Sequence, residues 1–184
     1  PNTGVVTNTS LSCNATFTDA EDGNITPSYE WTVNGNLVSS SVTYIVDAGD
    51  TDVADSIVCT ATAIDLDSQN SHSTSDTASV TVENTDPVLS AVTITPNSNV
   101  YNDSVLTCSA APSDPDEVVT ESYSWTVGGV IVGSNPSLDL ATTSAMPFDI
   151  VECTVSVNDS DGGSDSAVGS VTLDNRAPST PTVS

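Results

Sequence analysis

Three short segments decide the fold: residues 106–110 (LTCSA), 123–127 (YSWTV) and 151–157 (VECTVSV). In each of them apolar side chains alternate with polar ones, which is the pattern of a β-strand with one buried face. The predicted buried faces carry Cys108, Trp125 and Cys153. The sequence therefore predicts a tryptophan-bearing strand that follows one cysteine-bearing strand and precedes another.

The first half of the chain repeats this frame as Cys13, Trp31 and Cys59. The spacings are 18 and 28 residues in the first copy and 17 and 28 residues in the second. A frame that returns after 94 to 95 residues is typical of a tandem repeat of one structural unit. We therefore expect one domain at residues 1–83 and another at 84–174.

Both ends of the chain fit this repeat. The first strand of the second domain is predicted at 88–95, and the first domain has no counterpart of it. Residues 175–184 form a linker and the start of a following repeat's first strand. The chain therefore reads as part of a longer array, in which the partners of each repeat are its neighbours. The alternative is a homopolymer in which residues 178–184 of one chain fill the vacant sheet edge of another.

The duplicated Cys–Trp–Cys frame resembles that of immunoglobulin-like tandem modules, among them the PKD-like and cadherin-like repeats of prokaryotic surface proteins. The resemblance covers essentially the whole chain. It is also carried by the Tyr-x-Trp-Thr-Val segments at 29–33 and 123–127, and by linkers that contain asparagine and end in proline, at 84–87 and 175–178. It implies an all-β fold of two tandem immunoglobulin-like Greek-key β-sandwiches.

The resemblance also implies one disulfide in each domain. In such a sandwich the two cysteines of a repeat lie on facing strands, and a core tryptophan shields their sulfur atoms from water. Paired cysteines indicate an oxidising compartment and hence an extracellular or cell-surface protein. Four reduced core thiols in a cytosolic protein are the alternative. The implied pairs are Cys13 with Cys59 and Cys108 with Cys153, covered by Trp31 and Trp125 respectively.

Local patterns add details within the first domain. Asn34-Gly35 is a strong signal for a hairpin turn, and Gly128-Gly129 replaces it in the second domain. The polar residues 18–27 are expected to form a loop. The alternation of residues 42–46 predicts that Val42, Tyr44 and Val46 point into the core.

The charge of the chain is strongly negative. It has 25 acidic residues, no lysine, a single arginine (Arg176) and a single histidine (His72), which gives a formal net charge of −24. A nucleic-acid-binding surface needs clustered lysine and arginine, so nucleic acid is excluded as a partner. The same lack of basic residues argues against anionic membranes, and no apolar run is long enough for membrane insertion.

The acidic residues are placed in a repeated pattern. Each of the four cysteines is followed by an aspartate six residues later and by a second acid eight residues later. In an immunoglobulin topology the two loops that carry these acids lie at the same end of the sandwich, where the chain enters. The linker adds Glu83 and Asp86 there. The converging acids are Asp114, Asp116, Asp159 and Asp161 in the second domain, and Asp19, Glu21, Asp65 and Asp67 in the first.

Carboxylates that converge repel one another unless a cation neutralises them. A flexible ligand set made only of oxygen favours Ca²⁺ over zinc, copper or Mg²⁺. We therefore expect calcium at Glu83, Asp86 and the four acids of the second domain, a weaker site in the first domain, and no organic cofactor. Calcium would stiffen the interdomain joint, as the cadherin resemblance implies. The alternative is that the acids form solvated Asx turns on an acidic surface adapted to high salt.

Other chemistry is weakly indicated. His72 lies alone in a polar loop and is expected to be solvated, while Arg176 is expected to pair with one of the loop acids. Nothing supplies a catalytic nucleophile with its base, an oxyanion donor or a substrate clamp, so we do not expect an enzyme. Five Asn-x-Ser/Thr sequons allow for glycosylation, at Asn8, Asn14, Asn24, Asn102 and Asn158.

These features favour a structural or adhesive function: a stiff stalk or fibre segment of a secreted or surface-anchored protein. The alternative is a ligand-binding accessory module, for example a glycan-binding module, of a secreted enzyme. Such a module presents exposed aromatic side chains, whereas both tryptophans and most tyrosines here fall at predicted core positions.

Overall fold

The structure is a computed structural model that describes residues 3–65 and 72–181. Its contacts divide the chain into two compact units. Unit 1 consists of Pro1–Thr85 with Pro115–Glu117, and unit 2 of Asp86–Asp114 with Val118–Ser184.

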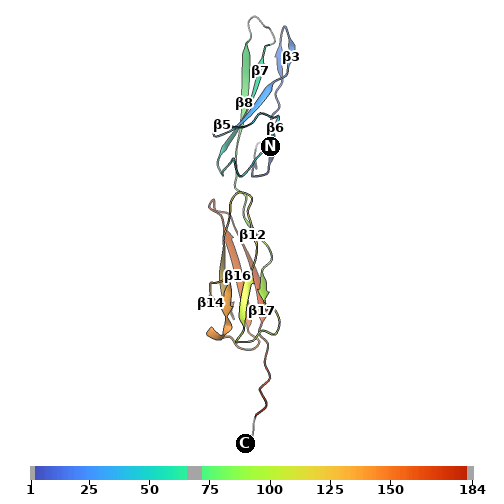
Figure 1. Cartoon of the computed structure of the whole chain (residues 1–184). Coiled ribbons are helices and arrows are strands. Elements are labelled where there is room, and N and C mark those ends of the chain that lie inside the picture. Colours follow the sequence, from blue (N-terminus) through green and yellow to red (C-terminus); the bar gives the residue numbers. More distant parts are fainter. Residues whose placement is uncertain (1–2, 66–71, 182–184) are drawn as a thin grey trace. The chain divides into compact units, whose positions relative to one another are not determined.

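Unit 1 is built from antiparallel strands (Figure 1). A four-stranded sheet has the order β5-β4-β7-β8, β1 pairs with β6, and β2 pairs with β3. The strands are β1 (Ser10–Ser12), β2 (Phe17–Asp19), β3 (Gly23–Ile25), β4 (Ser28–Val33), β5 (Asn36–Ser39), β6 (Thr43–Ile45), β7 (Ser56–Ile64) and β8 (Ser73–Thr81).

Unit 2 repeats this plan. Its four-stranded sheet has the order β14-β13-β16-β17, and a three-stranded sheet has the order β10-β11-β15, while β9 pairs with β12. The strands are β9 (Val88–Leu89), β10 (Thr93–Thr95), β11 (Val105–Ser109), β12 (Pro112–Ser113), β13 (Glu121–Val127), β14 (Val130–Gly133), β15 (Ser137–Asp139), β16 (Ile150–Asn158) and β17 (Ser164–Thr172).

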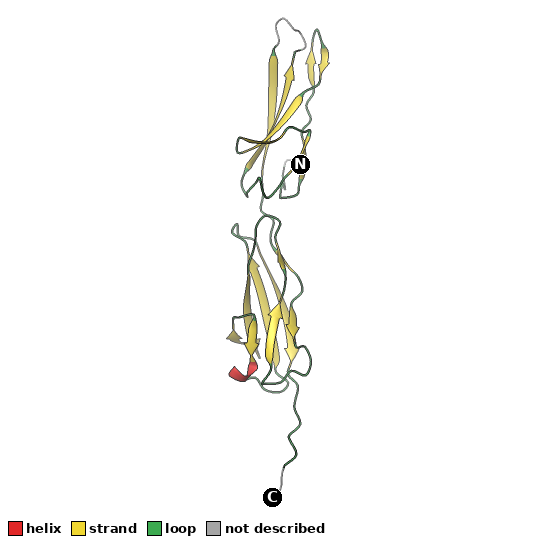
Figure 2. Cartoon of the chain, viewed as in Figure 1, coloured by secondary structure: helices red, strands yellow, loops and turns green. Residues whose placement is uncertain are grey.

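Strands dominate both units, as Figure 2 shows. A short 3-10 helix, η1 (Leu140–Thr142), follows β15 and is capped by the Asp139 side chain. Within the described residues, no helix has the length and apolar character that crossing a lipid bilayer requires. The predicted class, all-β with two immunoglobulin-like sandwiches, is confirmed by the strand order of both units.

The core of each unit is the alternating face of its strands. In β16 every second residue from Val151 to Val157 is buried, and the residues between them are exposed or half-buried. β7 shows the same alternation from Ile57 to Ala63. These faces are apolar in sequence, so their burial follows from the hydrophobic effect rather than from local backbone preference.

The two hairpins at the tryptophan strands form as predicted. Val33 pairs with Asn36 across the two-residue turn Asn34-Gly35, and both turn residues have positive φ, 49° and 85°. This geometry matches the right-handed twist of the flanking strands and favours asparagine and glycine. Gly128 and Gly129 form the corresponding turn with φ of 55° and 82°.

Two local predictions are wrong. Residues 18–27 are not a plain loop, because β2 and β3 form a small hairpin there, with Phe17 opposite Ile25. Val42 does not point into the core: it is 47% exposed, whereas Tyr44 and Val46 are buried as predicted. Val42 precedes β6, and its carbonyl accepts a hydrogen bond from the Cys13 N–H (2.9 Å). The backbone of Val42 therefore pairs with the neighbouring segment, while its side chain is exposed.

Candidate functional site

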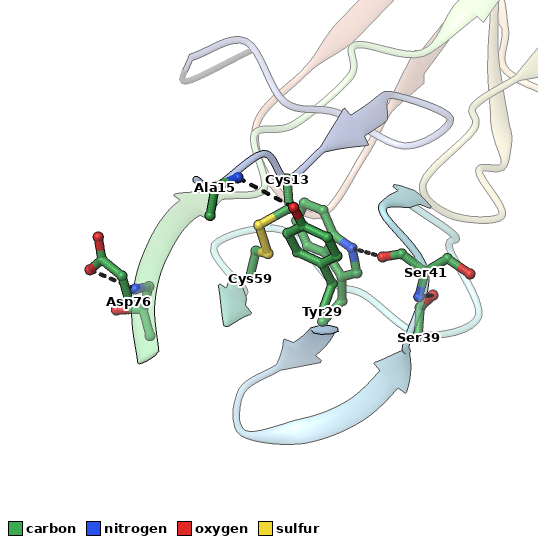
Figure 3. The surroundings of a disulfide bond; sticks show 9 residues. Cys13, Ala15, Tyr29, Ser39, Ser41, Cys59 and Asp76 are labelled. Atoms are coloured by element: carbon green, nitrogen blue, oxygen red, sulfur yellow. Dashed lines mark hydrogen bonds between the residues drawn. A yellow bond between two sulfur atoms is a disulfide. The ribbon is translucent and has the colours of Figure 1, made fainter. Parts of the chain in front are cut away.

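The disulfide cores are the best-defined sites of the molecule. Both predicted bridges form: Cys13–Cys59 with Cα atoms 6.3 Å apart, and Cys108–Cys153 with Cα atoms 6.4 Å apart. Cys108 lies in β11 and Cys153 in β16, so this bridge joins the two sheets of unit 2. Figure 3 shows the surroundings of the bridge in unit 1.

Both tryptophans lie in the core, as predicted. Trp31 is 4% exposed and Trp125 is fully buried. Each is paired in its sheet with the second cysteine of its unit. The indole N–H of Trp31 donates to the Ser41 carbonyl (2.9 Å), and that of Trp125 donates to the Asn135 carbonyl (2.8 Å). A buried indole therefore keeps its polar atom satisfied in both units.

The acidic loops of unit 1 meet as the sequence predicts. Asp19, Glu21 and Asp65 line one open cavity of about 360 Å³, together with the apolar side chains of Phe17 and Ile25. The fourth predicted acid of this unit, Asp67, lies outside the described residues. The β2–β3 hairpin and the end of β7 thus bring acids from both cysteine-bearing segments to one place.

His72 lies in the same cavity, which the sequence did not indicate. Its Nδ1 atom is 3.9 Å from Asp65 Oδ2, and its side chain is 76% exposed. The expected solvation of His72 agrees with this exposure. Its position follows from the pairing of β7 with β8, because Ile64 lies opposite Ser73 and the Asp65 N–H donates to the His72 carbonyl.

Asp19 forms an Asx turn. Its Oδ1 atom accepts hydrogen bonds from the backbone N–H groups of Glu21 (2.7 Å) and Asp22 (3.1 Å). These two hydrogen bonds hold the pKa of the Asp19 carboxyl below its usual value. The alternative to a calcium site was that the loop acids form solvated Asx turns, and Asp19 forms such a turn.

In unit 2 one of the predicted acids, Asp159, supports a backbone turn. Asp159 Oδ1 accepts from the N–H groups of Asp161 (3.0 Å) and Gly163 (2.6 Å). Asp161 Oδ2 accepts a longer hydrogen bond from the Ser160 hydroxyl (3.4 Å). Asp86 and Asp114 belong to this unit as well. The loop after β16 is therefore shaped by one carboxylate that accepts two backbone donors.

The two remaining predicted acids lie in unit 1. Glu83 Oε1 accepts from the Gly4 N–H (2.9 Å), and the Glu83 N–H donates to the Val5 carbonyl. Asp116 Oδ2 accepts from the Thr85 N–H (2.7 Å). Both carboxylates thus hold backbone at the end of unit 1.

The predicted calcium sites have no preformed ligand cluster within the described chain. Among residues 3–65 and 72–181, no group of three or more histidine, cysteine, aspartate or glutamate side chains is arranged to hold a metal ion. Of the predicted acids, Asp19 and Asp159 each accept two hydrogen bonds from backbone N–H groups instead. Calcium binding at the acidic loops stays a prediction.

Two polar contacts escaped the sequence analysis. Asp165 Oδ2 accepts from the Leu89 N–H (2.8 Å), across 76 residues of sequence. Arg176 was expected to pair with a loop acid, and this is wrong: both of its terminal nitrogens donate to the Asp103 carboxylate (2.9 and 2.7 Å). The Arg176 guanidinium also lies 4.1 Å from the centre of the Tyr101 ring. No motif in the sequence marks these partners, because each contact depends on the tertiary fold.

No protein-family model matches the chain, and no curated protein matches it. Among solved structures, the chain is similar to the three N-terminal domains of the Highly Immunogenic Outer Capsid protein (Hoc) of bacteriophage RB49, with 18% sequence identity and a TM-score of 0.38. The similarity covers 92% of this chain and 55% of that chain. Each unit has the strand order and the disulfide of an immunoglobulin-like β-sandwich.

Proposed function

We propose that the chain is a structural module of an extracellular or cell-surface protein, in which such units are joined in tandem as a stiff stalk or fibre segment. The observation that carries this proposal is the duplication of one disulfide-locked core. Both units place a cysteine pair and a tryptophan at equivalent positions. A repeated unit of this kind provides length and rigidity rather than a single reactive site.

The disulfides support the proposed location. Structural disulfides persist in oxidising compartments and are rare in the cytosol. The net charge of −24 further suits a surface that stays soluble and resists self-association. Neighbouring repeats of the same protein are the proposed partners.

A catalytic function is not part of the proposal. One cavity of unit 1 is lined largely by core side chains such as Leu11, Trp31 and Ile57, and in another the Asp19 carboxylate accepts hydrogen bonds from a backbone turn. The glycan-binding alternative receives no support from the tryptophans, since both are buried and their indole N–H groups bond to backbone carbonyls.

The proposal also includes calcium ions at the acidic loops. Ca²⁺ would bind the acidic loops and reduce the repulsion among their carboxylates. The shared cavity of Asp19, Glu21 and Asp65 supports it in unit 1. The Asx turns of Asp19 and Asp159 support the alternative, in which backbone donors already stabilise these carboxylates.

Single-molecule force spectroscopy tests the mechanical role. A stalk built of two locked units should show two discrete unfolding events. In each event the intact disulfide prevents the loop between its two cysteines, 46 or 45 residues long, from being stretched. Reduction should therefore lengthen each event by about 160 Å, at roughly 3.6 Å per residue.

A matched variant assigns the events. The double substitution Cys13→Ala and Cys59→Ala should lengthen the event of unit 1 and leave that of unit 2 unchanged. Extension without discrete force peaks in the oxidised protein would contradict the proposed load-bearing role, even if both units fold.

A further inference from the structure

The hairpin turn of unit 1 contains the single Asn-Gly pair of the sequence, Asn34-Gly35. An asparagine followed by glycine is prone to spontaneous deamidation, because glycine has no side chain that shields its backbone nitrogen. In this reaction the Gly35 nitrogen bonds to Cγ of Asn34, the Cγ–Nδ2 bond breaks, and the Gly35 amide proton leaves with ammonia. Water then opens the cyclic succinimide to aspartate or isoaspartate. The surroundings of Asn34 decide whether the reaction can proceed in the folded unit.

Both polar atoms of the Asn34 amide are held by hydrogen bonds. Its Nδ2 atom donates to Asp55 Oδ1 (2.6 Å), and its Oδ1 atom accepts from the Ser56 N–H (3.1 Å). The Asn34 N–H donates in turn to the Ser56 carbonyl (3.0 Å). These three hydrogen bonds, which we call the Asn34 latch, join segments 21 to 22 residues apart. The latch ties the hairpin turn to the start of β7.

Asp55, the acceptor in the latch, is itself fixed by a second turn. Its Oδ2 atom accepts from the Asp52 N–H (2.9 Å), and its own N–H donates to the Asp52 carbonyl (3.1 Å). The Val82 N–H donates to the Asp55 carbonyl (2.9 Å). The hydrogen bonds from Asp52 and from Asn34 hold the pKa of the Asp55 carboxyl below its usual value. The latch therefore joins the Asn34 amide to a charged and well-positioned carboxylate.

The turn conformation also separates the two reacting groups. Asn34 and Gly35 have φ of 49° and 85°, as in a type I′ turn, whose first central residue has a ψ of about 30°. At such a ψ the Gly35 nitrogen lies on the opposite side of the Asn34 Cα–C bond from Cβ. Attack on Cγ requires rotation about this bond, which would break the pairing of Val33 with Asn36. The hairpin must therefore open before Asn34 can react.

Unit 2 builds the same hairpin without a latch. Gly128-Gly129 forms the corresponding turn, with positive φ at both residues. Asp149 takes the place of Asp55 and accepts from the Met146 N–H (2.8 Å). Glycine has no amide side chain that could donate to this carboxylate or be deamidated. Unit 2 is therefore an internal control for the chemistry of Asn34.

We propose that Asn34 is a deamidation site controlled by the fold of unit 1: the latch and the turn protect its amide, and opening of the hairpin exposes it to Gly35. The modification prevents the latch from forming again. An aspartate product lacks the Nδ2 donor and sets a second carboxylate against that of Asp55, and like charges repel. An isoaspartate product adds a methylene group to the backbone of a two-residue turn. This inference does not depend on the mechanical role.

Peptide mapping of the complete chain by mass spectrometry tests the proposal. The protein is incubated at mildly alkaline pH, either native or unfolded in denaturant with its disulfides reduced, and is then digested with pepsin at low pH. The peptide that contains Asn34 is followed for the mass gained when ammonia is lost and water is added. The native chain should react at least about tenfold more slowly, because only the opened fraction of the hairpin is reactive.

Matched variants test the latch. Asp55→Ala removes the acceptor of Asn34 Nδ2 and should raise the native deamidation rate several-fold. Asp149→Ala removes the equivalent carboxylate of unit 2 and should leave the rate at Asn34 unchanged. Asp55→Asn keeps an acceptor oxygen and should react more slowly than Asp55→Ala. Equal rates in the two variants of Asp55, with unit 1 folded in both, would overturn the role of the latch.

A measurement on the wild type does not depend on how the variants fold. Urea below the unfolding transition should raise the deamidation rate at Asn34 in proportion to the hydrogen-exchange rate of the Asn34 N–H. Equal deamidation of native and unfolded chains would overturn the proposal, and so would the absence of deamidation at Asn34 in the unfolded chain.

A charge swap tests the consequence of the modification. Asn34→Asp copies the aspartate product and should lower the melting temperature of unit 1. Adding Asp55→Asn again sets an amide opposite a carboxylate, so the double variant should recover part of this loss. Asn34→Gly copies the turn of unit 2 and should abolish the mass gain. A double variant that melts no higher than Asn34→Asp would refute the repulsion between the two carboxylates.

Discussion

At the scale of single residues, Arg176 shows how one cation is used in a chain with 25 acids. Its guanidinium forms a two-point contact with the Asp103 carboxylate and lies over the Tyr101 ring. Arginine suits this place because its planar fork matches a carboxylate and its face stacks on an aromatic ring. The contact holds the segment after β17 against the turn before β11.

The pH dependence of this contact can be predicted. The hydrogen bonds from Arg176 lower the pKa of the Asp103 carboxyl in the folded protein. The contact therefore stabilises the fold above the unfolded pKa of aspartate, about 3.9, and this contribution is lost as the pH falls through the lowered folded value. Carbon-detected NMR titration should show the Asp103 pKa rising toward its usual value in Arg176→Ala.

Arg176→Lys separates the effect of the positive charge on the Asp103 pKa from that of the guanidinium geometry. Arg176→Lys keeps the positive charge but loses the fork and the stacking, so the Asp103 pKa should fall between those of the wild type and Arg176→Ala. An unchanged Asp103 pKa in Arg176→Ala would show that the contact does not form in solution.

At the scale of elements, the segment between β9 and β10 packs closely on β17 at Gly169, which has no side chain. Gly169→Ala would place a Cβ 2.8 Å from Val92 Cγ1 and 3.3 Å from the Val92 carbonyl oxygen. We expect the variant to lose about 1–3 kcal/mol of unfolding free energy, as overpacked cores do. Urea denaturation measures this loss, and hydrogen exchange should show opening of β9 and β10.

A second substitution tests the cause. Val92→Ala removes the methyl group in closest contact, so the double variant should lose less stability than the sum of the two single variants. Strict additivity would mean that Gly169→Ala acts through backbone flexibility rather than through this contact.

At the scale of the whole molecule, the net charge of −24 dominates the response to salt. Repulsion among the acids destabilises the compact state and is screened by ions. Scanning calorimetry should therefore show melting temperatures that rise with NaCl. If the acidic loops bind calcium, CaCl₂ should raise them further than NaCl or MgCl₂ at equal ionic strength.

A double variant distinguishes calcium that binds at the acidic loops from the general screening of charge by salt. Asp159→Asn with Asp161→Asn should remove the calcium-specific part in unit 2 and retain the response to NaCl. Equal effects of all three salts on the wild type would leave the acids as solvated Asx turns, the interpretation that the contacts of Asp19 and Asp159 already support.

The sequence by itself determined the repeated architecture. The alternation around Cys108, Trp125 and Cys153 predicts buried strand faces, and the resemblance of the Cys–Trp–Cys frame to immunoglobulin-like modules implied both disulfides and the burial of both tryptophans. The turn at Asn34-Gly35 could also be predicted, since the required positive φ is a local property of these residue types. The meeting of Asp19 with Asp65 followed from the topology that this frame implies.

Only the tertiary structure decided which segments pack against the apolar face of each strand. Alternation tells which side of a strand is apolar but not which strand covers it. The β2–β3 hairpin, the outward position of Val42 and the partner of Arg176 all depend on contacts between segments distant in sequence or on backbone pairing. Such contacts are set by packing in three dimensions, which no local pattern of residues records.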